Sequence, residues 1–258
     1  MAETGQPLVT LSVVSHGDAA RIARLLESLR LHEKTDHLQL ILTDNLGVDL
    51  PEFDPTSWAE LKILRNKRPA GFAHNQNQAL RSAQGKYFCV LNPDVVFEEA
   101  VLDPLLAGLE AGVADLIAPL VVNADGELQD SFRSLPTPIE TIRRRLPSYR
   151  FESLPIQVDG VIRPDWMAGI FLLMPAHVFH QLGGFDERYR IYFEDVDFCT
   201  RARLAGMKLA VDPRLRIRHE AQRASRKRFF FLLIHLISAV RFFTSMTYRR
   251  AKGGITKL

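Results

Sequence analysis

Short apolar runs alternate with helix-like segments through the first half of the chain, and this order limits the fold to a few classes. Residues 8–15 (LVTLSVVS) have the length and apolar content of a buried strand, and residues 18–30 place apolar side chains on one face of a helix. The same alternation gives expected strands at 38–43, 61–64, 87–91 and 116–122 and expected helices at 71–83 and 98–111. It predicts an α/β fold with a mostly parallel, Rossmann-like central sheet and helices on both faces.

The second half of the chain has a less regular pattern. Residues 135–155 are rich in Pro and Arg and are predicted to form a loop with a short helix. The pattern then predicts a turn and strand within 165–174, helices at 176–182 and 194–204, and a short strand at 208–211. We expect a domain over residues 1–222, followed by a basic and apolar helical tail over residues 223–258.

Charge is distributed unevenly, although the net charge is only +3. From Arg214 to the C-terminus there are twelve Lys or Arg and a single acid, Glu220, so the tail is a basic block. The stretch SRKRFFFLLIHLISAVRFF favours an amphipathic helix on an anionic membrane surface. The alternative is a helix packed on the domain or in a dimer interface. Nucleic acid is not expected, because the aromatic residues form one run and are not interleaved with Arg.

The cysteines, the N-terminus and the longest apolar run indicate the cellular compartment. Its two cysteines, Cys89 and Cys199, lie in apolar stretches, which predicts core thiols in a reducing compartment without a disulfide framework. The N-terminus has no signal-peptide pattern. The longest apolar run, residues 229–240, is too short to span a bilayer, so no crossing is expected.

Common cofactor and nucleophile motifs are absent from the sequence, including GxGxxG, GxxxxGK[ST], GxSxG and HExxH. In open parallel sheets, ligands bind beyond the carboxyl ends of the strands. The polar residues that follow the expected strands are therefore the candidates for a site. They are Ser15-His16, Asp44-Asn45, Arg65-Asn66 and Asn92-Pro93-Asp94.

Two of these acids each allow two interpretations. Asp94 follows an apolar strand and could hold a hard divalent cation together with substrate phosphates, or it could cap the helix that follows. Asp44 could accept hydrogen bonds from a ribose or base. For Asp44 alone, a turn-forming role is favoured.

A third group of acids begins the expected helix at 194–204. Glu194, Asp195 and Asp197 are flanked by aromatic residues, and the helix dipole alone would favour acids in a first turn. Asp197 and Arg201 are four positions apart and are predicted to pair. Glu194 and Asp195 are then left to face a ligand, one of them as a general base. His219 stands alone in the sequence, and a lone His is more often structural than a metal ligand.

Taken in order, these segments resemble family 2 glycosyltransferases of the GT-A fold, in the rhamnosyltransferase-like branch. The resemblance runs from Leu8 to about Phe243. It rests on the strand ends at Ser15 and Asp44-Asn45 and on four further segments: NKRPAGFAHNQN (66–77), LNPD (91–94), WMAG (166–169) and GGFDE (183–187) with YFEDVD (192–197).

The resemblance implies a nucleotide-binding half at about 8–122 and an acceptor half at about 123–222. It implies Asp195 as the catalytic base with Glu194 beside it, and a Mg²⁺ or Mn²⁺ ion held by Asp94 and His219. Asn92 replaces the first acid of the family's metal motif. The implied nucleotide-binding residues are Ser15, His16, Asp44, Asn66, Gly71, Asn75 and Asn92, and the implied acceptor residues are Trp166, Ala168 and Gly169.

The implied reaction is inverting transfer of a sugar from a nucleotide diphosphate to a saccharide hydroxyl. The branch favours dTDP-L-rhamnose as donor and a polyprenyl-linked saccharide as acceptor, at the cytoplasmic face of the plasma membrane. The alternative is a non-catalytic relative that binds sugar nucleotides. The oligomeric state is left open, a homodimer included.

Overall fold

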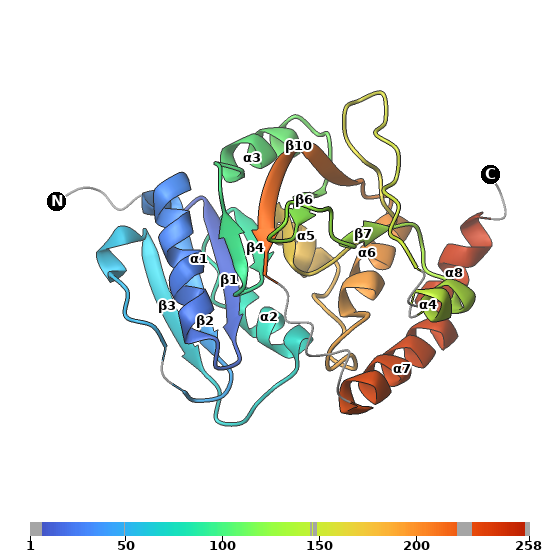
Figure 1. Cartoon of the computed structure of the whole chain (residues 1–258), viewed down its shortest axis with the longest axis horizontal. Coiled ribbons are helices and arrows are strands. Elements are labelled where there is room, and N and C mark those ends of the chain that lie inside the picture. The colour runs from blue at the N-terminus through green and yellow to red at the C-terminus, as the bar shows by residue number, and fades with distance from the viewer. Residues whose placement is uncertain (1–6, 49, 145, 147–148, 221–228, 256–258) are drawn as a thin grey trace.

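The computed structural model describes residues 7–48, 50–144, 146, 149–220 and 229–255 (Figure 1). Its main sheet has eight strands in the order β3-β2-β1-β4-β9-β6-β10-β5. These strands are β1 (Val9–Ser15), β2 (Leu38–Asp44), β3 (Glu60–Arg65), β4 (Tyr87–Leu91), β5 (Val95–Phe97), β6 (Leu116–Val122), β9 (Phe171–Pro175) and β10 (Leu209–His219). The predicted α/β fold is confirmed.

The first four strands in this order are parallel, with β3 at the partly exposed edge of the sheet. Every residue of β1, β2 and β4 is buried. Because successive side chains point to opposite faces of a strand, helices or loops must cover both faces of the sheet here. The covering helices include α1 (Ala19–His32), α2 (Phe72–Leu80), α3 (Leu102–Glu110) and α5 (Ala176–Gln181), with 3₁₀ turns at Thr35–His37 and Pro55–Ser57.

The rest of the sheet, from β9 to β5 in the strand order, contains both parallel and antiparallel pairs. β9 runs antiparallel to both β4 and β6, and β10 runs parallel to β6. The predicted strand at 208–211 is too short, because β10 continues to His219 after a register shift between Asp212 and Arg216. The extra length pairs with β5, where His219 lies opposite Val95. The helix predicted at 98–111 begins only at Leu102, since the chain after Asp94 forms β5.

The second half of the chain also forms a separate two-stranded sheet. It pairs β7 (Phe132–Arg133) with β8 (Trp166–Met167), and the short helix α4 (Pro138–Arg143) follows β7, as the loop prediction anticipated. Helix α6 (Glu194–Leu204) has the predicted bounds and contacts β8.

Two C-terminal helices, α7 (Phe229–Thr244) and α8 (Met246–Ile255), pack against each other, and α8 also packs against α6 (Figure 1). Ser238, Ala239 and Phe242 form the buried side of α7, and Phe242 has no exposed surface. The predicted boundary at 222–223 and the basic residues 223–228 lie outside the described residues. Among the described residues, no single helix is long and apolar enough to cross a membrane; α7 and α8 pass that test only as a pair bent by 54°. Cys89 and Cys199 are free and buried, as predicted.

Candidate functional site

The predicted ligand residues come together because the strand ends are in register. Ser15 lies opposite Asp44 in the β1–β2 pair, and Asp44 lies opposite Arg65 in the β2–β3 pair. Asp44 Oδ1 accepts backbone hydrogen bonds from Leu46, Gly47 and Val48 at 3.3, 2.8 and 3.3 Å. Asp44 therefore builds the turn after β2, the role favoured for it from sequence, while Oδ2 lies 3.9 Å from Arg65 Nε.

A network of side-chain amides holds the neighbouring residues. Asn66 Nδ2 donates to Asn45 Oδ1 and to Asn75 Oδ1, both at 2.7 Å. Asn45 Oδ1 also accepts from the Ala70 N–H at 2.8 Å. Asn45 Nδ2 lies 2.9 Å from His16 Nδ1, and burial lowers the pKa of His16, so its ring is held neutral. Asn66, Asn75 and His16, all predicted to contact the nucleotide, thus lie in one cluster, with Asn45 at its centre.

Asp94 and His219, which are 125 positions apart in sequence, meet at the β5–β10 pair. Asp94 Oδ1 lies 3.1 Å from His219 Nε2, and the Glu220 N–H donates to the Asp94 carbonyl at 2.9 Å. The alternative role for Asp94 as a helix cap is wrong, since a strand follows it. Glu33 instead accepts the Val101 and Leu102 N–H groups at the start of α3.

The chemistry of this pair fits a cation. His219 Nδ1 lies 2.8 Å from Gln129 Oε1, which can only accept, so Nδ1 donates and Nε2 is the ring nitrogen that faces Asp94. Asp94 Oδ1 is a buried oxygen that accepts no hydrogen bond among the described residues. A carboxylate oxygen and an imidazole nitrogen turned toward each other are a donor set that a divalent cation can use. No described group of three or more His, Cys, Asp and Glu could hold a metal, so substrate oxygens would complete this shell.

The candidate base lies at the start of α6, directly after a strained turn. Tyr192 and Phe193 both have φ of +69°, a conformation that non-glycine residues rarely adopt. The Phe193 ring packs on Phe242 and Phe243 of α7, with centroids 5.5 and 5.8 Å apart. Packing from the C-terminal helix therefore supports the backbone turn that presents Glu194 and Asp195.

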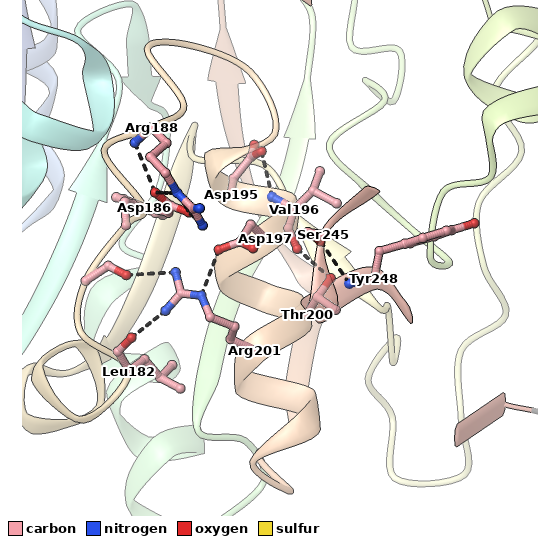
Figure 2. Close-up of polar contacts among 12 residues, drawn as sticks. Leu182, Asp186, Arg188, Asp195, Val196, Asp197, Thr200, Arg201, Ser245 and Tyr248 are labelled. Carbon is pink, nitrogen blue, oxygen red and sulfur yellow. Dashed lines mark hydrogen bonds and ion pairs between the residues drawn. The ribbon is translucent and has the colours of Figure 1, made fainter. Parts of the chain in front are cut away.

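Glu194 and Asp195 are neighbours with different surroundings. Asp195 Oδ2 accepts the Gly169 N–H at 3.1 Å, and Oδ1 accepts the Val196 N–H at 2.8 Å (Figure 2). Glu194 is buried, and its Oε2 has no hydrogen-bond partner among the described residues. Burial raises the pKa of both carboxyl groups, and the charge of Asp195 raises the pKa of Glu194 further, whereas the backbone N–H groups oppose the rise at Asp195. The two backbone N–H groups therefore favour the ionised form of Asp195, and Glu194 Oε2 has no such donor among the described residues.

The predicted pairing of Asp197 with Arg201 is confirmed. Arg201 Nε lies 2.7 Å from Asp197 Oδ2, and the same guanidinium donates to the Leu182 carbonyl and, at 2.8 Å, to the Gly184 carbonyl (Figure 2). Arg201 thereby connects α6 to the Gly183-Gly184 turn and pairs with Asp197, whereas the hydrogen bonds of Asp195 among the described residues come from backbone N–H groups.

Glycines let the two halves of the sequence approach closely. A Cβ atom on Gly71 would lie 2.6 Å from the Arg190 carbonyl oxygen, which also accepts the Phe72 N–H at 2.9 Å. Asn77 on α2 bonds the Phe185 backbone N–H and carbonyl at 2.9 and 2.8 Å. Because Gly71 has no side chain, the start of α2 can contact the loop before α6. Gly71 therefore has a packing role, although it was predicted to bind nucleotide.

The predicted acceptor residues lie beside Asp195. Trp166 is 5% exposed in β8, the Ala168 N–H donates to the Ser131 carbonyl at 2.7 Å, and Gly169 donates to Asp195. The next residue, Ile170, accepts the Asn92 N–H at 2.9 Å. Adjacent residues 169 and 170 thus connect the candidate base to the turn that carries Asp94.

Sequence analysis named Asn45 as a candidate without giving it a role, and it missed Gln129. Asn45 follows the β2 strand end, and this position was a usable signal, but only the structure shows how many contacts it makes. Gln129 bonds both the ring and the carbonyl of His219, at 2.8 and 2.7 Å, and no pattern around residue 129 indicates this.

Sequence comparisons agree with this arrangement. The family model described as "Glycosyl transferase family 2" matches residues 10–169. The rhamnosyltransferase WbbL of Escherichia coli is 30% identical over 234 residues, covering 86% of this chain and 87% of that protein. The N-acetylglucosaminyl-diphospho-decaprenol L-rhamnosyltransferase of Mycobacterium tuberculosis H37Rv is 27% identical, covering 80% of this chain and 74% of that protein.

Solved structures share the fold at low sequence identity. GalNAc-T7 with UDP, GalNAc and Mn²⁺ aligns with a TM-score of 0.62 at 16% identity; the match covers 84% of this chain but only 44% of that one. The mannosyltransferase PcManGT of Pyrobaculum calidifontis, with GDP-Man and Mn²⁺, aligns at 0.58 and 17% identity, covering 95% and 69%. The chain has the GT-A fold and is an enzyme of glycosyltransferase type that moves a sugar in polysaccharide biosynthesis. It belongs to glycosyl transferase family 2, as a rhamnosyltransferase-like member.

Proposed function

We propose that the enzyme transfers L-rhamnose from dTDP-L-rhamnose to a hydroxyl of a lipid-linked saccharide with inversion at the anomeric carbon. The observation that carries the proposal is the link between Asp195 and the Asp94 turn through residues 169 and 170. It brings a basic carboxylate and a cation-compatible pair to one place. Such a place can receive an acceptor hydroxyl on one side and a leaving diphosphate on the other.

Asp195 acts as the general base in this proposal. It is held by two backbone N–H groups, which fix the carboxylate and favour its ionised form. It takes the proton of the acceptor hydroxyl, whose oxygen then attacks from the face opposite the diphosphate. Holding both substrates in line contributes as much as the proton transfer does.

A divalent cation would be held by Asp94 Oδ1 and His219 Nε2. When bound, it neutralises charge that develops on the leaving diphosphate. The Mn²⁺ in complexes of two proteins with the same fold supports this assignment. Gln129 fixes the His219 ring so that Nε2 faces Asp94.

The donor assignment rests on two relatives named as rhamnosyltransferases, and it is tested by a thermal-shift panel. We expect dTDP and dTDP-L-rhamnose with Mg²⁺ or Mn²⁺ to raise the melting temperature more than UDP- or GDP-sugars do. The stabilisation follows ligand occupancy and is about 2.7 kcal/mol at a concentration 100-fold above Kd. A larger shift with a UDP-hexose would assign a different donor, and no shift with any sugar nucleotide would contradict the proposal as a whole.

The proposed acceptor is bound to a membrane, and α7 offers a surface for that contact. Leu236, Ile237 and Val240 are 58, 52 and 54% exposed, although the opposite side of α7 is also apolar and buried. Exposed Arg249 and Arg250 follow on α8. An apolar surface with nearby cations suits an anionic bilayer. We infer the inner face of the plasma membrane, with the enzyme otherwise cytoplasmic, because two free buried cysteines suit a reducing compartment.

This contact predicts a surface-specific loss of vesicle binding. The double variant Leu236→Glu/Ile237→Glu should lower binding to phosphatidylglycerol vesicles at least about tenfold in a co-sedimentation assay, because two large apolar side chains no longer insert. Leu31→Glu is the control, since Leu31 is 72% exposed on α1. Equal binding by both variants and the wild type would remove α7 as the membrane contact.

A further inference from the structure

Arg144 is a cation on the acceptor side that the reaction described so far does not use. It follows α4, and 27% of its side chain is exposed. Its Nη2 lies 2.7 Å from Asp130 Oδ2, and its Cζ lies 5.8 Å from the centre of the Trp166 ring. Asp130 is the one hydrogen-bond partner of this guanidinium among the described residues, so several of its N–H groups are available to a ligand.

Two buried donors lie beside Arg144 without acceptors. Arg133 Nη2 and Trp166 Nε1 form no hydrogen bonds within the described part of the chain, although Arg133 and Trp166 are only 7 and 5% exposed. The two residues lie directly opposite each other in the β7–β8 pair, which places their side chains on the same face. A buried donor without an acceptor is unfavourable, by roughly 1–3 kcal/mol. This wall of the acceptor side is therefore rich in donors and favourable to an anion.

The carboxylates of Asp130 and Glu140 hold the two arginines in position without engaging all of the guanidinium N–H groups. Asp130 bonds Arg133 Nε through one oxygen and Arg144 through the other, and Glu140 lies 3.6 Å from Arg133 Nη1. The rings of Tyr149 and Phe151 flank the Arg133 guanidinium at 5.1 and 4.7 Å. Arg133 is thus fixed behind the site, and Arg144 is the member that a ligand can reach.

The position relative to the base is set by the chain itself. Trp166 is three residues before Gly169, whose N–H bonds Asp195. The charge of Arg144 also helps to lower the pKa of Asp195 against the rise caused by burial. An anion on Arg144 would therefore lie on the same side as the acceptor, near the carboxylate that takes the acceptor proton.

Exposed apolar side chains lie on α4 and just after its end. Ile139 and Ile142, three positions apart on one side of α4, are 72 and 68% exposed, and Leu146, beyond the end of the helix, is 52% exposed. A cation beside exposed apolar side chains matches a ligand that has an anionic head and a hydrocarbon chain.

We infer that Arg144 binds the phosphate groups of a diphosphate-linked lipid acceptor, with the Arg133 and Trp166 N–H groups behind it and the lipid chain along Ile139, Ile142 and Leu146. This subsite rests on the proposed function, since it specifies the acceptor of the same reaction. A guanidinium suits a diphosphate because its paired N–H groups match two phosphate oxygens. The subsite would select acceptors by the group that joins saccharide to lipid.

The test measures binding of farnesyl diphosphate, a prenyl diphosphate without a sugar, by calorimetry below its micelle concentration. Saturating dTDP and Mg²⁺ are present, so the donor site is already filled. We expect saturable binding by the wild type and a Kd at least about tenfold higher for Arg144→Gln, as expected from loss of a charged hydrogen bond. Arg144→Lys should lie between them, and inorganic pyrophosphate should bind more weakly than farnesyl diphosphate.

The matched control is Arg143→Gln, which removes the same charge from the adjacent, exposed residue and should change Kd by less than about twofold. Equal effects of the two Gln variants, absence of wild-type binding, or equal affinity for pyrophosphate would each overturn the subsite. These results are separable from failure of the proposed function, which would appear as absent binding of dTDP or absent sugar transfer.

Discussion

We expect Asp195→Asn to lower kcat by about 10²–10⁴-fold, the usual contribution of a general base. Asn fills the same space and can still accept the Gly169 N–H, but it cannot take a proton from the acceptor hydroxyl. The Kd for dTDP should stay within about twofold, because Asp195 belongs to the acceptor side. Initial rates of sugar transfer and calorimetric dTDP titrations of the same preparation provide the measurement.

Glu194→Gln is the informative comparison for this variant. Burial and the charge of Asp195 raise the pKa of Glu194, which favours its protonated form, so Gln should preserve far more activity than Asp195→Asn does. Wild-type kcat should fall as pH falls through the pKa of Asp195, at a higher pH than for an ordinary Asp, because burial raises that pKa. Near-normal turnover by Asp195→Asn, or equal losses in the two variants, would refute the assignment of the base.

The second large effect is expected at Asp94. Asp94→Ala should lower kcat/KM by about 100-fold or more, because the cation loses one of its two proposed protein ligands. The affinity for Mn²⁺ should also fall. It is measured by electron paramagnetic resonance of free Mn²⁺ during a titration in the presence of dTDP. Asp125→Ala removes an exposed carboxylate from the turn after β6 and should leave both quantities unchanged.

A Gln129 variant distinguishes a cation site from a simple ion pair between Asp94 and His219. Gln129→Leu leaves Asp94 and His219 in the chain but frees the His219 ring, and a 10–100-fold loss of Mn²⁺ affinity is typical when such an outer contact is removed. If Asp94→Ala retained full Mn²⁺ affinity, the Asp94–His219 pair would have no role in holding the cation.

The parallel half of the fold was predictable because its signals are local. The strands β1, β2 and β4 are short apolar runs buried on both faces, and helical periodicity separates them. The β5–β10 pair was not predictable in this way. Its register joins residues 95–97 to residues 217–219, and nothing within either segment specifies the other. That omission also produced the incorrect alternative in which Asp94 caps a helix.

The site residues differ in the same way, since some have a local signal in the sequence and others do not. Residues that follow parallel strands, such as Asp44 and Asp94, were found because the strand ends share one edge of the sheet. His219 had no local signal for its position beside Asp94 and was assigned by family resemblance alone. Arg144 and Gln129 act through partners on other segments, so their surroundings become visible only in three dimensions.

The packing of Phe193 on Phe242 has a consequence for synthesis of the protein. A chain leaves the ribosome from its N-terminus, and a domain generally folds as a unit. The turn that carries Glu194 and Asp195 is completed by the Ser238 hydroxyl, which donates to the Ile191 carbonyl at 3.0 Å, and by the ring of Phe242. These partners leave the ribosome some fifty residues after the turn itself. In a nascent chain, the turn that carries the candidate base is therefore completed only after α7 has been synthesised.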